Sequence, residues 1–165
     1  MKKLICSLLI IIALTNNSFS AGSSGDNDGG SAAKVSNYTK AKNLIKAAKK
    51  YEKKGKIEKA QTRYAKAQKL LIKSNEKKPL QADTLNYLGF TTRKLGDYEK
   101  GEEFYLQGLQ IEPNHNGINE YLGELYIVTN RMDLAKERLN ALKSCNCKEY
   151  KQLKEIIEGT RKSKY

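Results

Sequence analysis

Residues 82–115 read ADTLNYLGFTTRKLGDYEKGEEFYLQGLQIEPNH, and residues 116–149 read NGINEYLGELYIVTNRMDLAKERLNALKSCNCKE. Leu88-Gly89 in the first stretch and Leu122-Gly123 in the second occupy the same place, and the residues around the two pairs also match. Self-similarity at a period of about 34 residues is typical of helical repeat arrays, in which each unit is a helix-turn-helix that stacks on its neighbours. The period therefore predicts an all-α protein.

The two stretches resemble the tetratricopeptide repeat (TPR) family, whose pattern places Leu-Gly and Tyr on a first helix, then Ala-x3-Phe and Pro on a second. A weaker first unit begins at about Ala41, and no unit keeps the family's leading Trp. The matching residues are Ala47-Ala48, Tyr51, Ala60, Tyr64 and Ala67, then Leu88-Gly89, Gly101, Tyr105, Gly108 and Pro113, then Leu122-Gly123, Tyr126, Ala135, Leu139 and Leu142. The resemblance implies a right-handed superhelical array of about three repeats, at about 41–81, 82–115 and 116–149, within a domain over 38–165.

Small residues and turn residues recur at matching places in the three units. We expect the small residues to let the two helices of a pair approach closely where they cross; they are Ala48, Gly89 and Gly123 on the first helices, and Ala60, Gly101 and Ala135 on the second. Gly55-Lys56, Gly96-Asp97 and Asn130-Arg131 fall where each pair must turn, and Gly and Asn tolerate the left-handed conformation that ends a helix.

The two ends of the array depart from the repeat. The first unit is longer than the other two, and its surplus lies in Leu71–Gln81. Two interpretations stay open: a second helix extended by a turn or two and then a longer loop, or plain sequence drift. At the other end, about 148–159, apolar residues recur at helical spacing. We expect a capping helix there, since a terminal repeat otherwise leaves an apolar face bare.

The first residues of the chain predict export. A basic start is followed by the apolar run Leu4–Leu14, which is short for a bilayer span, and by small residues around Ser20. This order is typical of a signal peptide over 1–20 that is cleaved after Ser20, with an uncleaved anchor as the alternative. Residues 21–37 are rich in Gly, Ser and Asp, which predicts a flexible linker. We expect an exported bacterial protein, most simply in the periplasm.

Charge is concentrated in the first unit. Sixteen basic and three acidic residues lie between Lys34 and Lys78, whereas residues 79–165 hold thirteen of each. The predicted basic patch is on the first helix, at Lys42, Lys46, Lys49, Lys50 and Lys53. It suggests an anionic envelope surface as a partner, and the alternative is a solvated face. Nucleic acid is not expected, because Arg63 is the only Arg in that stretch and Lys lacks the fork that reads phosphates.

No constellation of residues predicts catalysis, a metal site or a cofactor. Cys145 and Cys147 form a C-x-C pair, for which we weigh a local disulfide or two thiols of structural role against a redox or metal-handling site. His115 follows Pro113-Asn114 and is expected to be exposed in a loop. Without a nucleophile or further ligands beside it, one His is no active site. The chain is therefore not expected to be an enzyme.

The resemblance implies that the first helices line a groove that binds a protein or peptide. The residues expected to contact a partner there are Asn86, Phe90, Arg93, Glu120 and Glu124. Phe90 beside Arg93 is the best candidate for a peptide contact, and the alternative is that Phe90 packs between units. Since three repeats make a small surface, the protein could also self-associate. The predicted function is a non-catalytic binding scaffold of the bacterial cell envelope.

Overall fold

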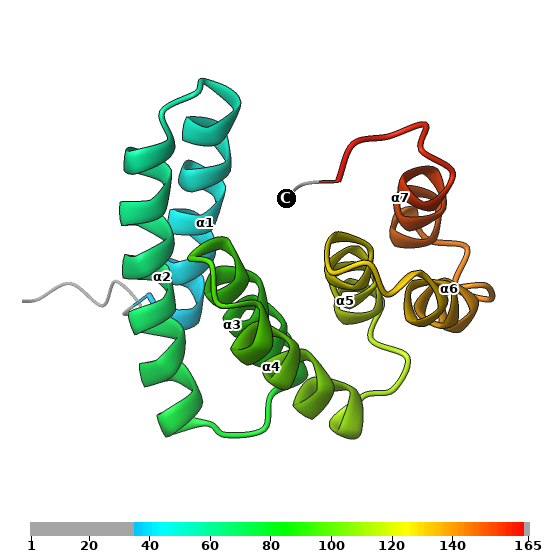
Figure 1. Ribbon diagram of the computed structural model, residues 1–165. Coiled ribbons are helices and arrows are strands. Elements are labelled where there is room, and N and C mark those ends of the chain that lie inside the picture. The colour runs from blue at the N-terminus through cyan, green and yellow to red at the C-terminus, as the bar shows by residue number, and fades with distance from the viewer. Residues whose placement is uncertain (1–34, 164–165) are drawn as a thin grey trace, which may run out of the picture. The chain divides into compact units, whose positions relative to one another are not determined.

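The computed structural model describes residues 35–163, which form seven α-helices and no strand (Figure 1). The predicted signal peptide over 1–20, and the predicted linker up to residue 34, lie outside the described residues. The helices are α1 (Asn37–Lys53), α2 (Ile57–Lys77), α3 (Ala82–Lys94), α4 (Tyr98–Ile111), α5 (Asn116–Val128), α6 (Met132–Ala141) and α7 (Lys148–Ile157). Among these seven, none has both the length and the apolar character that crossing a bilayer requires.

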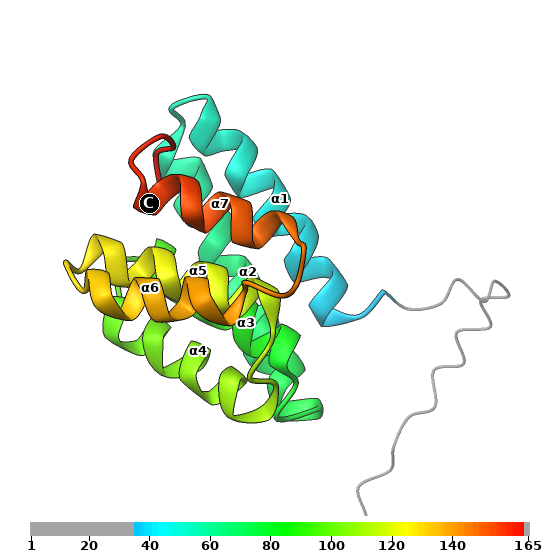
Figure 2. The ribbon, with the colours of Figure 1, turned by 90° about the vertical axis from the view of Figure 1, so that its right-hand side faces the viewer.

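The first six helices form three helical hairpins, α1–α2, α3–α4 and α5–α6, and α7 follows them (Figures 1 and 2). Each hairpin packs on the next through its second helix and the following first helix, as α2 does on α3 and α4 does on α5. The first helices α1, α3 and α5 also contact one another in order. The predicted class, an all-α helical repeat array, is confirmed.

Left-handed residues end the first helix of every hairpin, as the sequence predicts. Gly55, Gly96 and Asn130 have φ of 67°, 100° and 58°. Asp97 then caps α4, since its Oδ1 accepts from the backbone N–H of Lys100 at 2.9 Å. Such a cap satisfies one of the N–H groups that have no partner inside the helix.

The surplus of the first unit is an extended helix. α2 has 21 residues, compared with 14 in α4 and 10 in α6. The buried Leu71 of α2 packs in the same core cluster as Leu85 and Leu88 of α3. The chain then passes Pro79 and the left-handed Leu80, with φ of 56°, before α3 begins at Ala82.

Glycine makes room for a neighbouring helix at two matching places, but the neighbours differ. A Cβ on Gly89 would lie 2.5 Å from the ring of Tyr105, so α3 and α4 touch here as expected. A Cβ on Gly123 would lie 2.6 Å from a methyl group of Leu153 in α7. At Gly123 the nearest side chain therefore belongs to the capping helix and not to the second helix of the same hairpin. Its space is taken by the capping helix, whose Leu153 is fully buried.

Candidate functional site

The five residues expected to line a groove lie on α3 and α5, and all are buried. Their exposed fractions range from 0% to 5%, for Asn86, Phe90, Arg93, Glu120 and Glu124. Side chains this inaccessible stabilise the stacking of units and do not present themselves to a partner. The five predicted groove residues therefore belong to the interior between hairpins and not to an open surface.

Phe90 packs between units, which is the alternative that the sequence left open. Its ring centroid lies 5.7 Å from that of Tyr64 in α2 and 5.0 Å from that of Tyr121 in α5. The Lys49 ammonium of α1 lies 4.3 Å from the Phe90 centroid. Phe90 therefore connects all three hairpins through aromatic contacts, which favour edge-on and offset geometries at these distances.

Arg93 and Glu124 form a buried polar contact region between the second and third hairpins. The Arg93 guanidinium donates to the carbonyl oxygen of Tyr121 at 2.7 Å and lies 5.8 Å from the centroid of the Tyr105 ring. Burial lowers the pKa of Arg93, and the nearby Tyr105 and Glu124 oppose this shift. The hydroxyl of Ser163, after α7, donates to Glu124 Oε2 at 3.1 Å. The C-terminal tail is thereby attached to α5.

The surface formed by the first helices carries half-buried tyrosines instead, with lysine ammonium groups over their rings. Tyr38 of α1 and Tyr87 of α3 meet edge-on with centroids 5.9 Å apart, and Lys42 Nζ lies 5.2 Å and 6.0 Å from the two rings. On α5, Tyr121 accepts a hydrogen bond from Lys49 Nζ at 3.2 Å. We call these five residues, Tyr38, Lys42, Lys49, Tyr87 and Tyr121, the inner face.

The sequence reasoning missed the tyrosines of the inner face, although a signal for two of them was present. Tyr87 and Tyr121 stand at the same place in successive units. Each precedes its Leu-Gly pair directly, and a helix position beside the buried Leu remains partly exposed. Burial raises the pKa of both hydroxyls, and Asp83 adds to the effect at Tyr87.

Two clefts adjoin this array. One, of about 460 Å³, lies between the start of α1, the end of α2 and the start of α3, and its lining includes Tyr38, Lys40, Lys77 and Lys78. Because Tyr38 lines this cleft and also belongs to the inner face, the cleft continues the inner face. A larger hollow of about 760 Å³ lies at the hairpin turns, and Arg131 and Glu102 in its lining bind each other in a two-pronged ion pair at 2.9 Å and 2.6 Å.

The five lysines of the predicted basic patch lie within about 100° of each other around α1. Four of them, Lys42, Lys46, Lys50 and Lys53, are exposed, and the ammonium groups of Lys42 and Lys49 lie over the tyrosine and phenylalanine rings described above. A second basic surface lies on α2, and the sequence reasoning did not single it out.

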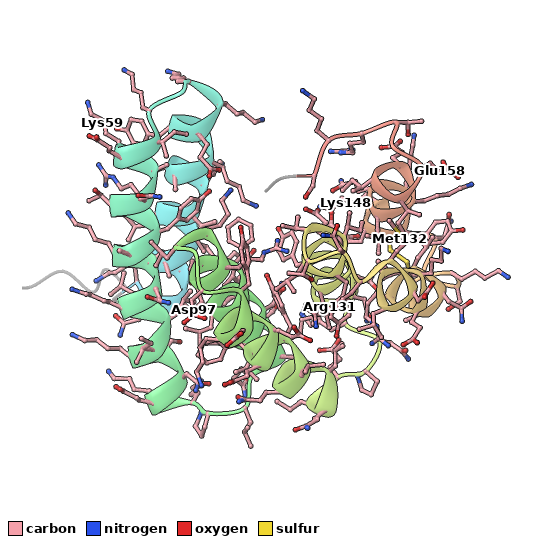
Figure 3. All side chains as sticks on the ribbon, viewed as in Figure 1. Lys59, Asp97, Arg131, Met132, Lys148 and Glu158 are labelled. Atoms are coloured by element: carbon pink, nitrogen blue, oxygen red, sulfur yellow. A yellow bond between two sulfur atoms is a disulfide. The ribbon has the colours of Figure 1, made fainter. Side chains whose placement is uncertain are left out.

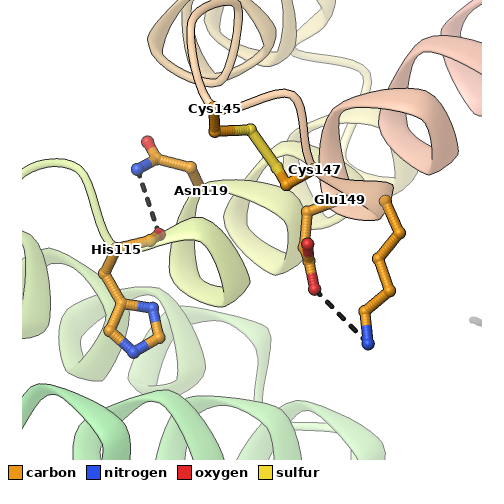
Figure 4. The surroundings of a disulfide bond; sticks show 6 residues. His115, Asn119, Cys145, Cys147 and Glu149 are labelled. Atoms are coloured by element: carbon orange, nitrogen blue, oxygen red, sulfur yellow. Dashed lines mark hydrogen bonds and ion pairs between the residues drawn. A yellow bond between two sulfur atoms is a disulfide. The ribbon is translucent and has the colours of Figure 1, made fainter.

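The C-x-C pair is a disulfide that joins Cys145 and Cys147 just before α7 (Figure 4).

His115 is not the exposed loop residue that the sequence suggests. Its Nδ1 accepts from the N–H of Ile118 at 3.1 Å and so caps α5, and its side chain is 11% exposed beside Asp83. Nowhere in residues 35–163 do three or more His, Cys, Asp or Glu side chains gather as metal ligands.

Comparisons with known proteins agree on the fold. No family model matches the sequence, and no curated protein matches it either. The Yersinia enterocolitica type III secretion translocator chaperone SycD is similar in structure, with a TM-score of 0.52 and 16% identity over 72% of this chain and 86% of that one. The first TPR of Spaghetti (RPAP3), bound to an HSP90 peptide, is also similar in structure. Its TM-score is 0.48, and its sequence identity is 17% over 74% of this chain and 94% of that one.

The TPR-containing C-terminal domain of a Plasmodium falciparum FK506-binding protein is also similar, with a TM-score of 0.44 and 20% identity over 77% of this chain and 94% of that domain. Two of these three neighbours are described as TPR domains. The seven helices of residues 35–163 form the helical-repeat fold that the Leu-Gly period predicts.

Proposed function

We propose that this chain is a non-catalytic scaffold of the bacterial cell envelope, which binds a protein or peptide segment on its inner face. The observation that carries the proposal is the set of three half-buried tyrosine rings, one from each hairpin, with two lysine ammonium groups beside them. Fold alone does not imply function, so this surface is what supports the proposal.

The chemistry of the inner face defines the segment that would suit it. Tyrosines held in place by their own packing offer large contact area at little entropic cost, which is why they anchor many interfaces. Lys42 is exposed, and its ammonium group is available to a carboxylate. We therefore expect an extended segment with apolar side chains that contact the rings and an acidic side chain near Lys42. The similarity to the chaperone SycD is in keeping with such a role.

Selection of peptides from a random library on the full chain would test this proposal. The selected peptides are then titrated against Lys42→Glu, with Lys136→Glu as the control, since Lys136 is an exposed lysine of α6 with the same charge change. A second pair compares Tyr87→Ala with Tyr98→Ala, because Tyr98 is 40% exposed on α4. We expect Lys42→Glu and Tyr87→Ala to weaken peptide binding by about tenfold or more, which is the effect of losing one interface anchor, and the two control variants to leave it unchanged.

Equal losses for inner-face and control variants, at unchanged stability, would place the peptide elsewhere and contradict the proposal. The envelope location depends on the predicted signal peptide and is tested separately. N-terminal sequencing of the protein from a periplasmic extract should find Ala21 as its first residue. Recovery of the uncut chain from the membrane fraction would favour the retained anchor.

A further inference from the structure

Six cationic side chains follow one face of α2 along almost its whole length. They are spaced three or four residues apart, at Lys59, Arg63, Lys66, Lys69, Lys73 and Lys77. At 100° per residue these positions fall within roughly 120° of each other and extend over about 27 Å of helix. The five lysines are exposed and Arg63 is partly exposed. We call this set the basic stripe.

The basic stripe faces away from the hairpin core. The buried residues of α2, including Tyr64 and Leu71, lie on the other side of the helix, where they pack against α1 and α3. Lys59, at the start of the stripe, projects outward from α2 (Figure 3). Because α2 belongs to the first hairpin, no further hairpin among the described residues covers this side.

The charge of the stripe is not neutralised within the fold. In residues 35–163 none of the six side chains forms an ion pair with another described residue. Residues 35–78 carry fifteen basic and only three acidic side chains, and one of these, Glu52, is bound to Lys94 at 2.6 Å and to the Tyr64 hydroxyl at 2.8 Å. Six like charges on one helix face repel each other in solution, so an anionic partner relieves a cost that the free protein bears.

We infer that the basic stripe docks this protein on an anionic lipid bilayer. A straight helix presents all six cations to a plane at once. Lysine is a point charge without a guanidinium's fixed fork, which suits mobile headgroups better than phosphates at set positions. A hollow of about 320 Å³, lined by Tyr51, Lys59, Thr62, Arg63 and Lys66, has room for a headgroup phosphate.

Single-stranded nucleic acid is the less suitable polyanion. It is normally bound by several aromatic side chains on which successive bases stack. The hollow beside the basic stripe contributes only one such ring, that of Tyr51. The docking surface meets the cleft beside the inner face at Lys77. The five other stripe residues do not line that cleft, so the inference does not depend on the proposed peptide binding.

Co-sedimentation of the full chain with phosphatidylglycerol-containing and purely zwitterionic vesicles tests the inference. The stripe variant is Lys59→Gln/Lys66→Gln/Lys73→Gln. Its control is Lys136→Gln/Lys143→Gln/Lys151→Gln, which removes the same charge from exposed lysines on and after α6. Each lysine near an anionic surface strengthens binding about fivefold, so we expect a loss of roughly a hundredfold in the stripe variant and a few-fold at most in the control.

The binding should also weaken in high salt, because these contacts are exposed to screening. Equal losses of vesicle affinity in the two triple variants would mean that binding depends on net charge alone, and would overturn the assignment to the stripe. Tighter binding to a duplex DNA or to a single-stranded oligonucleotide than to the anionic vesicles, at the same ionic strength, would overturn the assignment to lipid.

Discussion

Replacing Phe90 by alanine decides whether this residue holds the units together or contacts a partner. The side chain is 1% exposed and touches rings of α2 and α5, so its removal leaves a cavity between three hairpins. Phe→Ala at such a site costs about 3–5 kcal/mol, which combines lost transfer free energy with unfilled volume. A domain of this size is stable by about 5–15 kcal/mol, so the loss is a large share of the total.

The assay is urea unfolding followed by circular dichroism, with the change in midpoint converted through an unchanged slope. We also expect the melting temperature to fall by roughly 10–20 °C. Phe104→Ala is the matched control, because this phenylalanine of α4 is only partly buried against the same core cluster. Its loss should destabilise the protein clearly less than the loss of Phe90.

The two roles of Phe90 predict opposite outcomes. If Phe90 is an interface contact, Phe90→Ala will leave the unfolding free energy within about 1 kcal/mol of the parent, as surface substitutions usually do, and will abolish binding of the selected peptides. That combination would refute the burial described here. A large loss of stability would instead explain any weakened binding as a consequence of disturbed stacking.

Three further predictions concern stability. Burial raises the pKa of Tyr64 and Tyr121, so the folded state holds these protons more tightly than the unfolded chain does. The stability of the fold should therefore decrease as the pH rises above about 10. Tyrosinate absorbance should then appear together with unfolding, and titration of every tyrosine before unfolding would contradict this prediction. Leu153→Ala should cost about 2–5 kcal/mol in urea unfolding, because the fully buried side chain holds the capping helix, and a loss below about 1 kcal/mol would show that α7 is dispensable. Replacing Cys145 and Cys147 by serine should cost at most about 1.5 kcal/mol, since the closed loop is very short, and complete unfolding would contradict a merely local bridge.

The fold was predictable because stacking imposes a period on residue size. Gly89 is small because the Tyr105 ring takes the space of its Cβ, and Gly55, Gly96 and Asn130 end first helices in left-handed conformations. These requirements are local or repeat in every unit, so they appear directly in the order of residues. The same local pattern also anticipated the extended α2, although it could not exclude drift.

The candidate site was less predictable, because exposure depends on neighbours distant in sequence. Phe90 meets Tyr121 of the following hairpin and Tyr64 of the preceding one, and neither contact has a signature in the sequence around Phe90. His115 was misplaced for a related reason. A His after Pro-Asn is interpreted as a loop residue until the start of α5 is known, and only then does its ring become the cap of that helix.

Phe90 and Glu124 occupy the same place in successive units, and both are buried. The position is interior in both of these units, and the difference lies in what surrounds it. In the second unit the neighbours are aromatic rings, and an apolar side chain is stabilised there. In the third unit a carboxylate stands at that position, and burying a charge without compensation is costly.

Two groups from outside its own hairpin stabilise the buried carboxylate of Glu124. Arg93 is near enough for Glu124 to oppose the lowering of the arginine pKa by burial, and the hydroxyl of Ser163 donates to the carboxylate. Arg93 belongs to the second hairpin, and Ser163 belongs to the tail beyond α7. Glu124 therefore matches the third hairpin to the second hairpin on one side and to the C-terminal tail on the other.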